Sequence, residues 1–447
     1  MVGAANKAVQ ESVEKLCAIY DNSVATARRA VEQQEWGLWS QVVYPRLHVE
    51  VLEWRPIDRA APFGYVEEAG HYSAEISRPH IMRPYLEEQL THLTSNYPCR
   101  IWVEPGATRI PPEYLPGIGS VGEVRPAGVP RPSLDDVHDA IVDADWDAFH
   151  GSEKPLFYFG PQRFDIACAR IEHYTGIEVE SLQRFILFTN YDMHTTEFEK
   201  LGRARLAEEG TRYTGITTAV AGHQMPRIDL TTEDGDGITM INIGVGPSNA
   251  KTITDALAVL RPEAWIMIGH CAGLDGRMRI GDLILGNAYQ REDYILDRHV
   301  RRDVPIPAIP EVQRALEASV AEVYSADKSL MRTGTVLSTG DRNWEWHTPR
   351  ELWSWLHGST AVAVDMESCT LATNGYRYRV PYGTLLSVSD LPLHAVPKLP
   401  SQAKAFYSNS KEAHVTCAVR AMETLALHPE RLRTRKLRRS IGEVPFR

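Results

Sequence analysis

Two carboxylates follow a short apolar run in the stretch AVAVDMESCT, residues 361–370. The four residues that open it are typical of a buried strand, and the residues that close it, with the SCTLATNGY continuation, are typical of a helix start. Asp365 and Glu367 lie between these two patterns. Because α/β proteins bind their ligands where strands end, we expect an acid with a ligand-binding role here.

A second apolar run, in LLSVSDLPLH, ends on Ser389 and Asp390 and is followed by a proline. Asp390 could cap a helix or turn, or it could protonate a leaving-group nitrogen if burial raised its pKa. Cleavage of a glycosidic bond needs one group on the sugar hydroxyls and another on the leaving group. The two acids, together with the aromatic loop TGDRNWEWH on which a base could stack, therefore favour this chemistry.

The stretch IGVGPSN follows an expected strand and opens an expected helix, as a dinucleotide-binding loop would. The fingerprint is incomplete, because Asn249 replaces its third glycine and Glu263 precedes the next strand instead of ending it. Gly244 and Gly246 then indicate a close backbone approach, either to a ligand or to a packed helix. Ser248 is the expected N-cap of the helix that follows.

The stretch IGHCAGL has the same arrangement of a strand followed by small residues. Gly269, Ala272 and Gly273 keep side chains away from the strand end, so its backbone groups could contact the edge of a flat ligand. His270 and Cys271 are adjacent and lack the spacing of metal ligands. A structural or hydrogen-bonding histidine is the better interpretation.

Strand-like runs that alternate with helical stretches begin near residue 160 and predict a mixed, largely parallel sheet with both faces covered. Before them, a helical stretch at 4–34 and several alternating strands predict a smaller α+β domain. A segment rich in proline and glycine at 105–133 is typical of a linker. We predict an N-terminal domain at 1–155 and an α/β catalytic domain at 156–447.

The composition is that of a folded globular protein, since 43% of the 447 residues are hydrophobic and 24% are charged. The net charge of −10 argues against a nucleic-acid partner. The six cysteines show no paired or metal-binding spacing. We expect no membrane partner and a cytoplasmic location, because the sequence contains neither a signal-peptide pattern nor an apolar run of ~18 residues.

The C-terminal two thirds of the chain resembles the purine nucleoside phosphorylase superfamily, and within it the AMP nucleosidase family. The stretches that carry the resemblance occur in the family's order, and the N-terminal part matches less well, best at SRPHIMRPYLEEQL. The matching stretches are HYTGIEVESLQRFILFTNY, GITMINIGVGPSNAKTITDALAVLRP, IGHCAGL, DRNWEW, AVDMES, YRYRVPYGTLLSVSD and KLRRSIGEVPFR. The resemblance implies a three-layer nucleoside-phosphorylase-like domain that hydrolyses AMP to adenine and ribose 5-phosphate, in purine salvage and adenylate-pool regulation.

The resemblance also implies roles for individual residues. Glu367, with Met366 beside it, would accept hydrogen bonds from the ribose 2′ and 3′ hydroxyls, whereas Asp365 would be structural. Asp390, with Ser389, would protonate N7 of adenine. Further substrate contacts would come from Trp344 as the stacking face, with Trp346 as a competitor, from the backbone of Gly269, His270, Cys271, Ala272 and Gly273, and from Asn190.

One departure from the phosphorolytic relatives concerns the nucleophile. These relatives have an arginine in the strand before the glycine loop that grips phosphate, and this chain has Met267 there. The difference favours water over inorganic phosphate. For the 5′-phosphate of the substrate, the candidates are Arg342, His394 and Lys398.

The family resemblance further implies a homohexamer that is activated allosterically by Mg-ATP and inhibited by phosphate, with a regulatory N-terminal domain. No cofactor is expected for the chemistry itself, and no metal site is predicted. Residues 1–150 contain no P-loop pattern. Two alternatives remain open: a phosphate-dependent purine nucleoside phosphorylase, which Met267 disfavours, and a non-catalytic AMP sensor, which would not need Asp390.

Overall fold

The computed structural model describes residues 2–58, 61, 63–119, 125–143, 153–219, 222–324, 329–394, 400–432 and 443–447. Its described residues form two compact units. The first comprises Met1–Arg170, Val259–Arg261 and Arg438–Arg447, and the second comprises Ile171–Ala258 and Pro262–Leu437. The boundary predicted between residues 155 and 156 stays a prediction.

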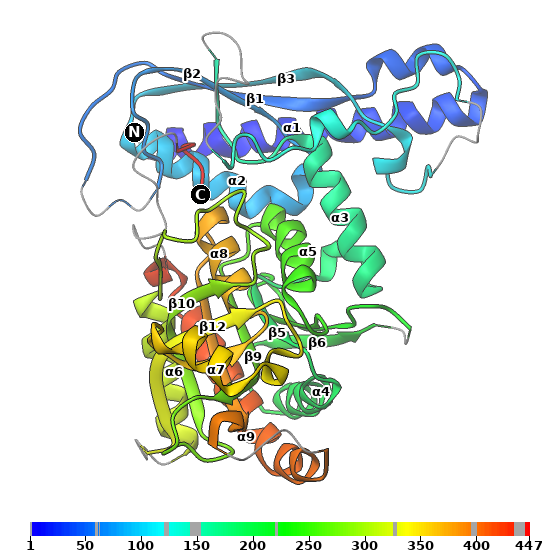
Figure 1. The fold of residues 1–447 in the computed structure, drawn as a ribbon. Coiled ribbons are helices and arrows are strands. Elements are labelled where there is room, and N and C mark those ends of the chain that lie inside the picture. The colour runs from blue at the N-terminus through cyan, green and yellow to red at the C-terminus, as the bar shows by residue number, and fades with distance from the viewer. Residues whose placement is uncertain are drawn as a thin grey trace. The chain divides into compact units, whose positions relative to one another are not determined.

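The first unit is built on a small sheet and two long helices (Figure 1). Within the described residues the sheet has four strands in the order β3-β1-β2-β4, where β1 is antiparallel to β2 and β3, and β2 is parallel to β4. This confirms the α+β character expected of the N-terminal part. The elements are α1 Val2–Gln33, β1 Val43–Val51, β2 Gly70–Glu75, α2 Pro79–Asn96, β3 Cys99–Arg109 and β4 Glu153–Pro155, followed by α3 Pro161–Thr175.

A buried cluster joins α1 to the sheet of this unit. Tyr20, Ala27 and Ala30 of α1 pack with Trp39 and Tyr44 near the start of β1. The residues of β1 are buried or half-buried, and Tyr44 at its second position belongs to this cluster. The helical spacing read from residues 4–34 therefore corresponds to the face of α1 that packs on the sheet.

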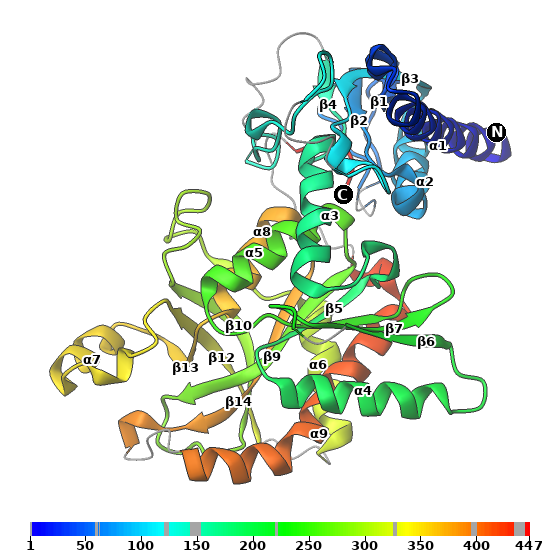
Figure 2. The same ribbon diagram turned by 90° about the vertical axis from the view of Figure 1, so that its right-hand side faces the viewer.

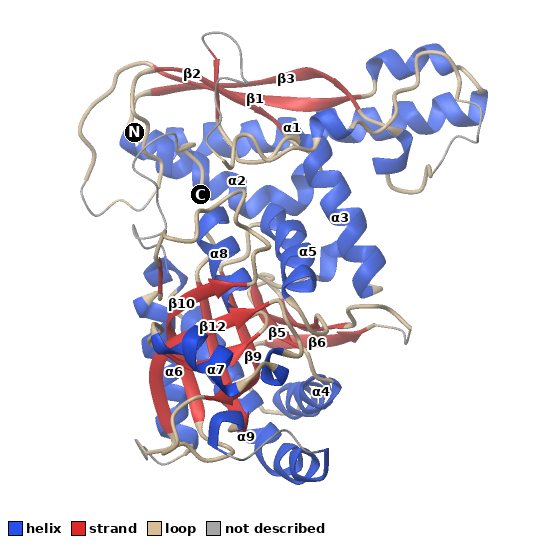
Figure 3. Cartoon of the chain, in the orientation of Figure 1, coloured by secondary structure: helices blue, strands red, loops and turns tan. Residues whose placement is uncertain are grey.

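The second unit contains a mixed sheet of ten strands among the described residues, shown in red in Figure 3. Its order is β11-β10-β12-β13-β9-β5-β8-β7-β6, and β14 pairs with both β9 and β10. The strands are β5 Phe185–Thr189, β6 Tyr213–Thr218, β7 Arg227–Thr232, β8 Ile238–Asn242, β9 Ala264–Gly273, β10 Leu283–Glu292, β11 Ile306–Pro307, β12 Met331–Thr339, β13 Ala361–Asp365 and β14 Tyr382–Asp390.

Strand β14 closes part of this sheet on itself. It runs parallel to β9 and antiparallel to β10, while β13 runs antiparallel to β9 and parallel to β12. The strands β10, β12, β13, β9 and β14 therefore form a closed ring. All residues of β9 and β14 are buried, as their continuous apolar runs predict.

Helices cover both faces of this sheet, so the unit has three layers, as predicted (Figure 2). Helices α5 and α8 pack together on one face, and α4, α6 and α9 pack on the other. The helices are α4 Asp192–Leu206, α5 Pro247–Leu257, α6 Pro310–Val323, α7 Pro349–His357, α8 Ser368–Tyr378 and α9 Pro400–Ala426. Among the described residues, no helix is long and apolar enough to cross a membrane.

The start of α5 differs from the prediction. Pro247 is the first helical residue and Gly246 is the N-cap, so the assignment of Ser248 as the N-cap was wrong. Gly246 has a φ of +116°, a backbone conformation that residues with a Cβ atom rarely adopt. Because proline is favoured at the first helical position, the helix begins two residues earlier than an N-cap at Ser248 would place it.

Candidate active site

Asp365 ends β13 and holds the start of α8. Its Oδ1 accepts a hydrogen bond from Ser338 Oγ at 2.5 Å, and its Oδ2 accepts bonds from the backbone N–H and Oγ of Ser368 at 3.0 and 2.5 Å. Ser338 Oγ in turn accepts the backbone N–H of Cys369 at 2.9 Å. Both oxygens of Asp365 are thus used to join β12, β13 and α8, as expected of a structural acid.

Glu367 is held by two other elements. Its side chain is 2% exposed, and its Oε1 accepts the backbone N–H of Gly246 at 2.5 Å. Its Oε2 accepts Nδ2 of Asn190, which follows β5, at 3.3 Å. The close backbone approach predicted for the glycine loop is therefore an approach to a carboxylate. The loop before α5 and the end of β5 fix the direction in which Glu367 points.

Burial dominates the electrostatics of this acid pair. Removal from water raises the pKa of Glu367, and the nearby Asp365 raises it further. Burial also raises the pKa of Asp365, but the hydrogen bonds from Ser338 and Ser368 oppose the effect. Asp365 is therefore the better stabilised anion, and Glu367 is the member of the pair that more readily holds a proton.

Asp390 ends β14 and is 2% exposed. Ser389 Oγ lies 2.5 Å from Asp390 Oδ1 and 3.2 Å from the carbonyl oxygen of Cys271, so this hydroxyl links the acid to β9. The pairing of β14 with β9 is irregular between Val388 and Asp390. The irregularity changes the direction in which the last residues of the strand point.

The two predicted acids flank the same point of β9. Ala272 pairs with Asp390 of β14 on one side and with Val364 of β13 on the other. Strands that share one neighbour are roughly 10 Å apart, and Glu367 follows Val364 by three residues. The strand end GHCAG thus lies between the two acids.

The glycines of β9 lie where neighbouring side chains pack closely against the strand. A Cβ atom on Gly269 would lie 3.3 Å from Asn190 Oδ1, and one on Gly273 would lie 2.7 Å from a methyl group of Leu391. Both glycines are fully enclosed within a buried strand. The small residues predicted to clear the strand end are therefore needed for packing as well.

His270 is part of an aromatic cluster. Its ring lies 4.4 Å from that of Tyr191 and 5.4 Å from that of His194, and His194 lies 5.2 Å from His414 of α9. Burial lowers the pKa of His414 to about 4 and that of His194 well below its ordinary value, so both rings are neutral at physiological pH. Sequence reasoning missed His194 and His414, because they come from separate helices with no pattern that connects them.

The two candidate stacking residues differ sharply in exposure. Trp344 is 6% exposed and packs with Ala272, Leu337 and Val364, whereas Trp346 is 83% exposed. Trp344 also lines a cavity of about 570 Å³ with Thr339 and other residues. Neither Glu367 nor Asp390 is among the residues that line this cavity. Trp344 packs with Ala272, and Ala272 pairs with Asp390. Trp344 therefore lies close to the end of β9.

Two of the three candidate phosphate-binding residues lie in the part of the chain that the structure describes. Arg342 and His394 are both exposed, and His394 Nε2 lies 3.1 Å from the carbonyl oxygen of Leu274. Lys398 lies outside the described residues. Met366 is half-buried, and Met267 is buried in β9 between Phe188 of β5 and Thr384 of β14. The position at which we expected a phosphorolytic enzyme to have arginine is thus an apolar core position here.

Two family models match the chain. The model described as "Bacterial AMP nucleoside phosphorylase N-terminus" matches residues 11–153, and the model described as "Phosphorylase superfamily" matches residues 199–425. Together they cover most of both predicted domains.

Curated relatives match over different lengths. The AMP nucleosidase of Escherichia coli (strain K12) is 40% identical, and the match covers 98% of each chain. The 5′-methylthioadenosine/S-adenosylhomocysteine nucleosidase of Marinomonas sp. (strain MWYL1) is 25% identical over 35% of this chain and 70% of its own. Among solved structures, AMP nucleosidase from Bacteroides thetaiotaomicron VPI-5482 is 27% identical, with a TM-score of 0.45 over 59% of this chain and 97% of that one.

Proposed function

The chain belongs to the AMP nucleosidase family within the phosphorylase superfamily, and we propose that it hydrolyses the N-glycosidic bond of AMP to adenine and ribose 5-phosphate. The full-length similarity to an AMP nucleosidase supports the substrate and the reaction. The observation that supports the proposal most directly is that Val364 and Asp390 both pair with Ala272. Glu367 follows Val364 by three residues, so the two acids lie on either side of β9.

Glu367 binds the sugar in this proposal. A carboxylate can accept one hydrogen bond from each of two neighbouring hydroxyls, which matches the 2′ and 3′ groups of ribose. Gly246 and Asn190 orient the carboxylate before the substrate arrives, which lowers the entropic cost of alignment. The hydroxyl donors favour the ionised form of Glu367, against the effect of burial.

Asp390 acts on the leaving group. It donates a proton to N7 of adenine as the bond between C1′ and N9 breaks, and the bonding electrons leave with the base. Water then forms the new bond to C1′, and the proton that it releases balances the one donated to adenine. Ser389 holds Oδ1 of Asp390, so a defined oxygen faces the base. Trp344 is proposed as the surface that packs on the adenine ring.

The test is an assay of the purified chain with AMP in phosphate-free buffer, with separation of the products by chromatography. Adenine and ribose 5-phosphate in equal amounts are expected without added phosphate. Turnover only after phosphate is added, with a sugar 1-phosphate as product, would identify a phosphorylase. Binding of AMP without adenine release in any condition would identify a sensor.

We extend the proposal to regulation and location on the family resemblance. The expected form is a cytoplasmic homohexamer, activated by Mg-ATP, inhibited by phosphate, and regulated through the domain at 1–155. The six free cysteines agree with a reducing compartment. Sedimentation of the purified chain tests the assembly, and adenine release with and without Mg-ATP and phosphate tests the two effectors. The candidates Arg342, His394 and Lys398 remain proposals for the 5′-phosphate.

A further inference from the structure

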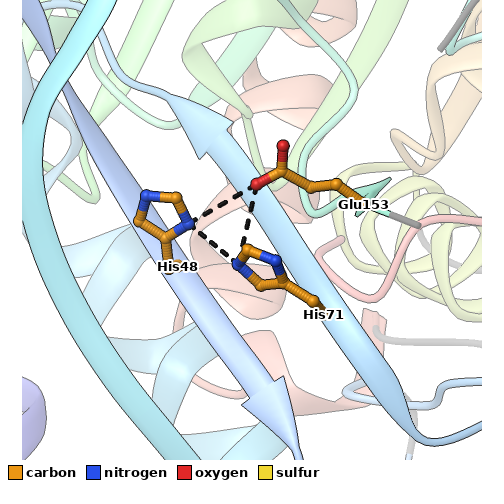
Figure 4. Close-up of side chains that lie close together, drawn as sticks. All are labelled: His48, His71 and Glu153. Atoms are coloured by element: carbon orange, nitrogen blue, oxygen red, sulfur yellow. Dashed lines mark hydrogen bonds and ion pairs between the residues drawn. The ribbon is translucent and has the colours of Figure 1, made fainter. Parts of the chain in front are cut away.

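Three side chains with metal-binding groups meet on one face of the four-stranded sheet of the first unit, and none of them is a residue assigned to AMP (Figure 4). His48 lies on β1, His71 on β2 and Glu153 on β4. His71 pairs directly with Glu153, and His48 pairs with Ser73, two residues along β2 from His71. Because residues two apart on a strand share a face, this register places all three side chains together.

The distances between the three ligating atoms are those of a metal site. His48 Nδ1 lies 2.9 Å from His71 Nε2, and Glu153 Oε1 lies 3.5 Å from the first nitrogen and 3.6 Å from the second. Ligands about 2.0–2.1 Å from a tetrahedral zinc ion are roughly 3.3 Å apart. The three atoms therefore form one face of a tetrahedron of nearly the right size.

Outer partners hold these ligands in place. A carboxylate oxygen of Glu104 lies 3.1 Å from His48 Nε2, an ion-pair contact without a hydrogen bond, and its charge favours the tautomer with the proton on Nε2 and a lone pair on Nδ1. Arg46 pairs with Oε2 of Glu153, which leaves Oε1 facing the two histidines. A carboxylate behind a metal-binding histidine is a frequent feature of zinc sites.

Stacking restricts the two rings further. The indole of Trp102 lies 4.8 Å from the ring of His48 at an interplanar angle of 2° and 5.1 Å from the ring of His71 at 22°. The side chain of His48 is 6% exposed, and those of His71 and Glu153 are 32% and 31% exposed. The cluster is thus rigid on its inner side and reachable by an ion from solvent.

We propose that His48 Nδ1, His71 Nε2 and Glu153 Oε1 bind a divalent transition-metal ion, with zinc as the best fit and water in the fourth position. Two imidazoles favour zinc and its neighbours over magnesium and calcium, which prefer oxygen ligands. The charges of Glu153 and Glu104 attract the ion, and that of Arg46 offsets one of them. Bound metal would join β4 to the β1–β2 pair and stabilise the folded sheet.

The test uses the full-length protein, dialysed against a chelator and then titrated with Zn²⁺ in a calorimeter. We expect one ion per chain and a rise in Tm on addition of Zn²⁺. Co²⁺ in place of Zn²⁺ should give the visible absorption of a four-coordinate site. Absence of stoichiometric binding would overturn the proposal, because it would leave the two imidazoles as a hydrogen-bonded pair only.

Variants locate the ion. His71→Ala and Glu153→Gln should each weaken Zn²⁺ binding by more than ~100-fold, and Glu104→Gln by ~10–100-fold, the usual effect of an outer partner. The matched control is His80→Ala, which removes an exposed histidine of the same unit that pairs with Asp21. Circular dichroism checks that each variant is folded. Equal affinity in wild type, His71→Ala and Glu153→Gln would place the ion elsewhere and contradict the proposal.

Discussion

The carboxylates around β9 and the His48–His71–Glu153 cluster are built in different ways. Glu367 and Asp390 are almost fully buried; Asp390 is the last residue of β14, and Glu367 follows the end of β13. The metal-binding cluster lies across three adjacent strands and is partly open to solvent. A site that protonates a leaving group benefits from exclusion of water, whereas a site that captures an ion needs a route from solvent. The comparison predicts that each site can be disrupted without the other.

The largest expected effect is that of Asp390→Asn. Loss of the general acid should lower kcat for adenine release by ~10²–10⁴-fold, while AMP binding is largely kept. Stopped-flow or quench assays give the rate, and calorimetry gives the affinity for AMP. The control is Asp303→Asn, an exposed acid of the same unit, and Zn²⁺ affinity should be unchanged in both variants. A variant at 390 with most of its activity would remove this residue from the mechanism.

Glu367→Gln should weaken both binding and rate. Each lost hydrogen bond to a charged group is worth ~1.5–3 kcal/mol, so kcat/KM for AMP should fall by at least ~10-fold. The variant should also discriminate less between AMP and 2′-deoxy-AMP, since the diol no longer meets a carboxylate. Steady-state kinetics with both substrates measures the change. Wild-type preference for 2′-deoxy-AMP would contradict the assigned contact.

Asp365→Asn tests whether Asp365 has a structural role, in contrast to the substrate-binding role of Glu367. Asparagine cannot accept all the bonds from Ser338 and Ser368, so the free energy of unfolding should fall by ~1–3 kcal/mol. Thermal or urea denaturation measures this loss. For the variant that stays folded, kcat should change far less than for Glu367→Gln. A stable variant without activity would show that Asp365 takes part in the chemistry.

Removal of metal should affect stability without affecting the chemistry. A ligand at 100 times its Kd stabilises by ~2.7 kcal/mol, so the chelated protein should have a Tm several degrees lower. Adenine release at a temperature where the protein is folded, measured without effectors, should stay within ~2-fold. His71→Ala should have the Tm of the chelated wild type and should not respond to Zn²⁺. A loss of catalysis on chelation would contradict this prediction and show that the metal site and the active site are coupled.

The smallest effect is a pH trend in stability. Burial raises the pKa of Glu367 above its ordinary 4.5, so the unfolded chain releases this proton at a lower pH than the folded protein does. The protonated Glu367 therefore stabilises the folded protein. This stabilisation is fully present below pH 4.5 and is lost as the pH rises through the raised pKa. The Tm of Glu367→Gln minus that of wild type should therefore increase between about pH 5 and about pH 9. A constant difference would show that burial does not perturb this group.

The strand ends could be predicted because local sequence determines them. The apolar runs of β9 and β14 are buried throughout and that of β13 is buried from Ala363 on, and small or acidic residues come where each run stops. The closure of the sheet through β14 and the antiparallel contact between β13 and β9 could not be predicted, since they depend on pairing between strands distant in the chain. The contact of Gly246 with Glu367 also depends on that pairing.

The histidine groups show the same limit. His194 and His414 meet through the packing of α4 against α9. The sequence of neither helix indicates which other helix it packs against. The ligands His48, His71 and Glu153 have no short spacing, because three strands with long connections supply them. Sequence motifs find sites formed by one or two segments. Sites formed by sheet register require the structure.

The most direct measurement for the central claim is a crystal structure of the Asp390→Asn variant with AMP bound. We expect the Glu367 carboxylate to lie ~2.6–3.2 Å from both the 2′ and 3′ hydroxyls, and the side chain at position 390 to lie within the same distance of N7. AMP bound with its ribose away from Glu367, or with N7 out of reach of position 390, would show that these two roles are wrong.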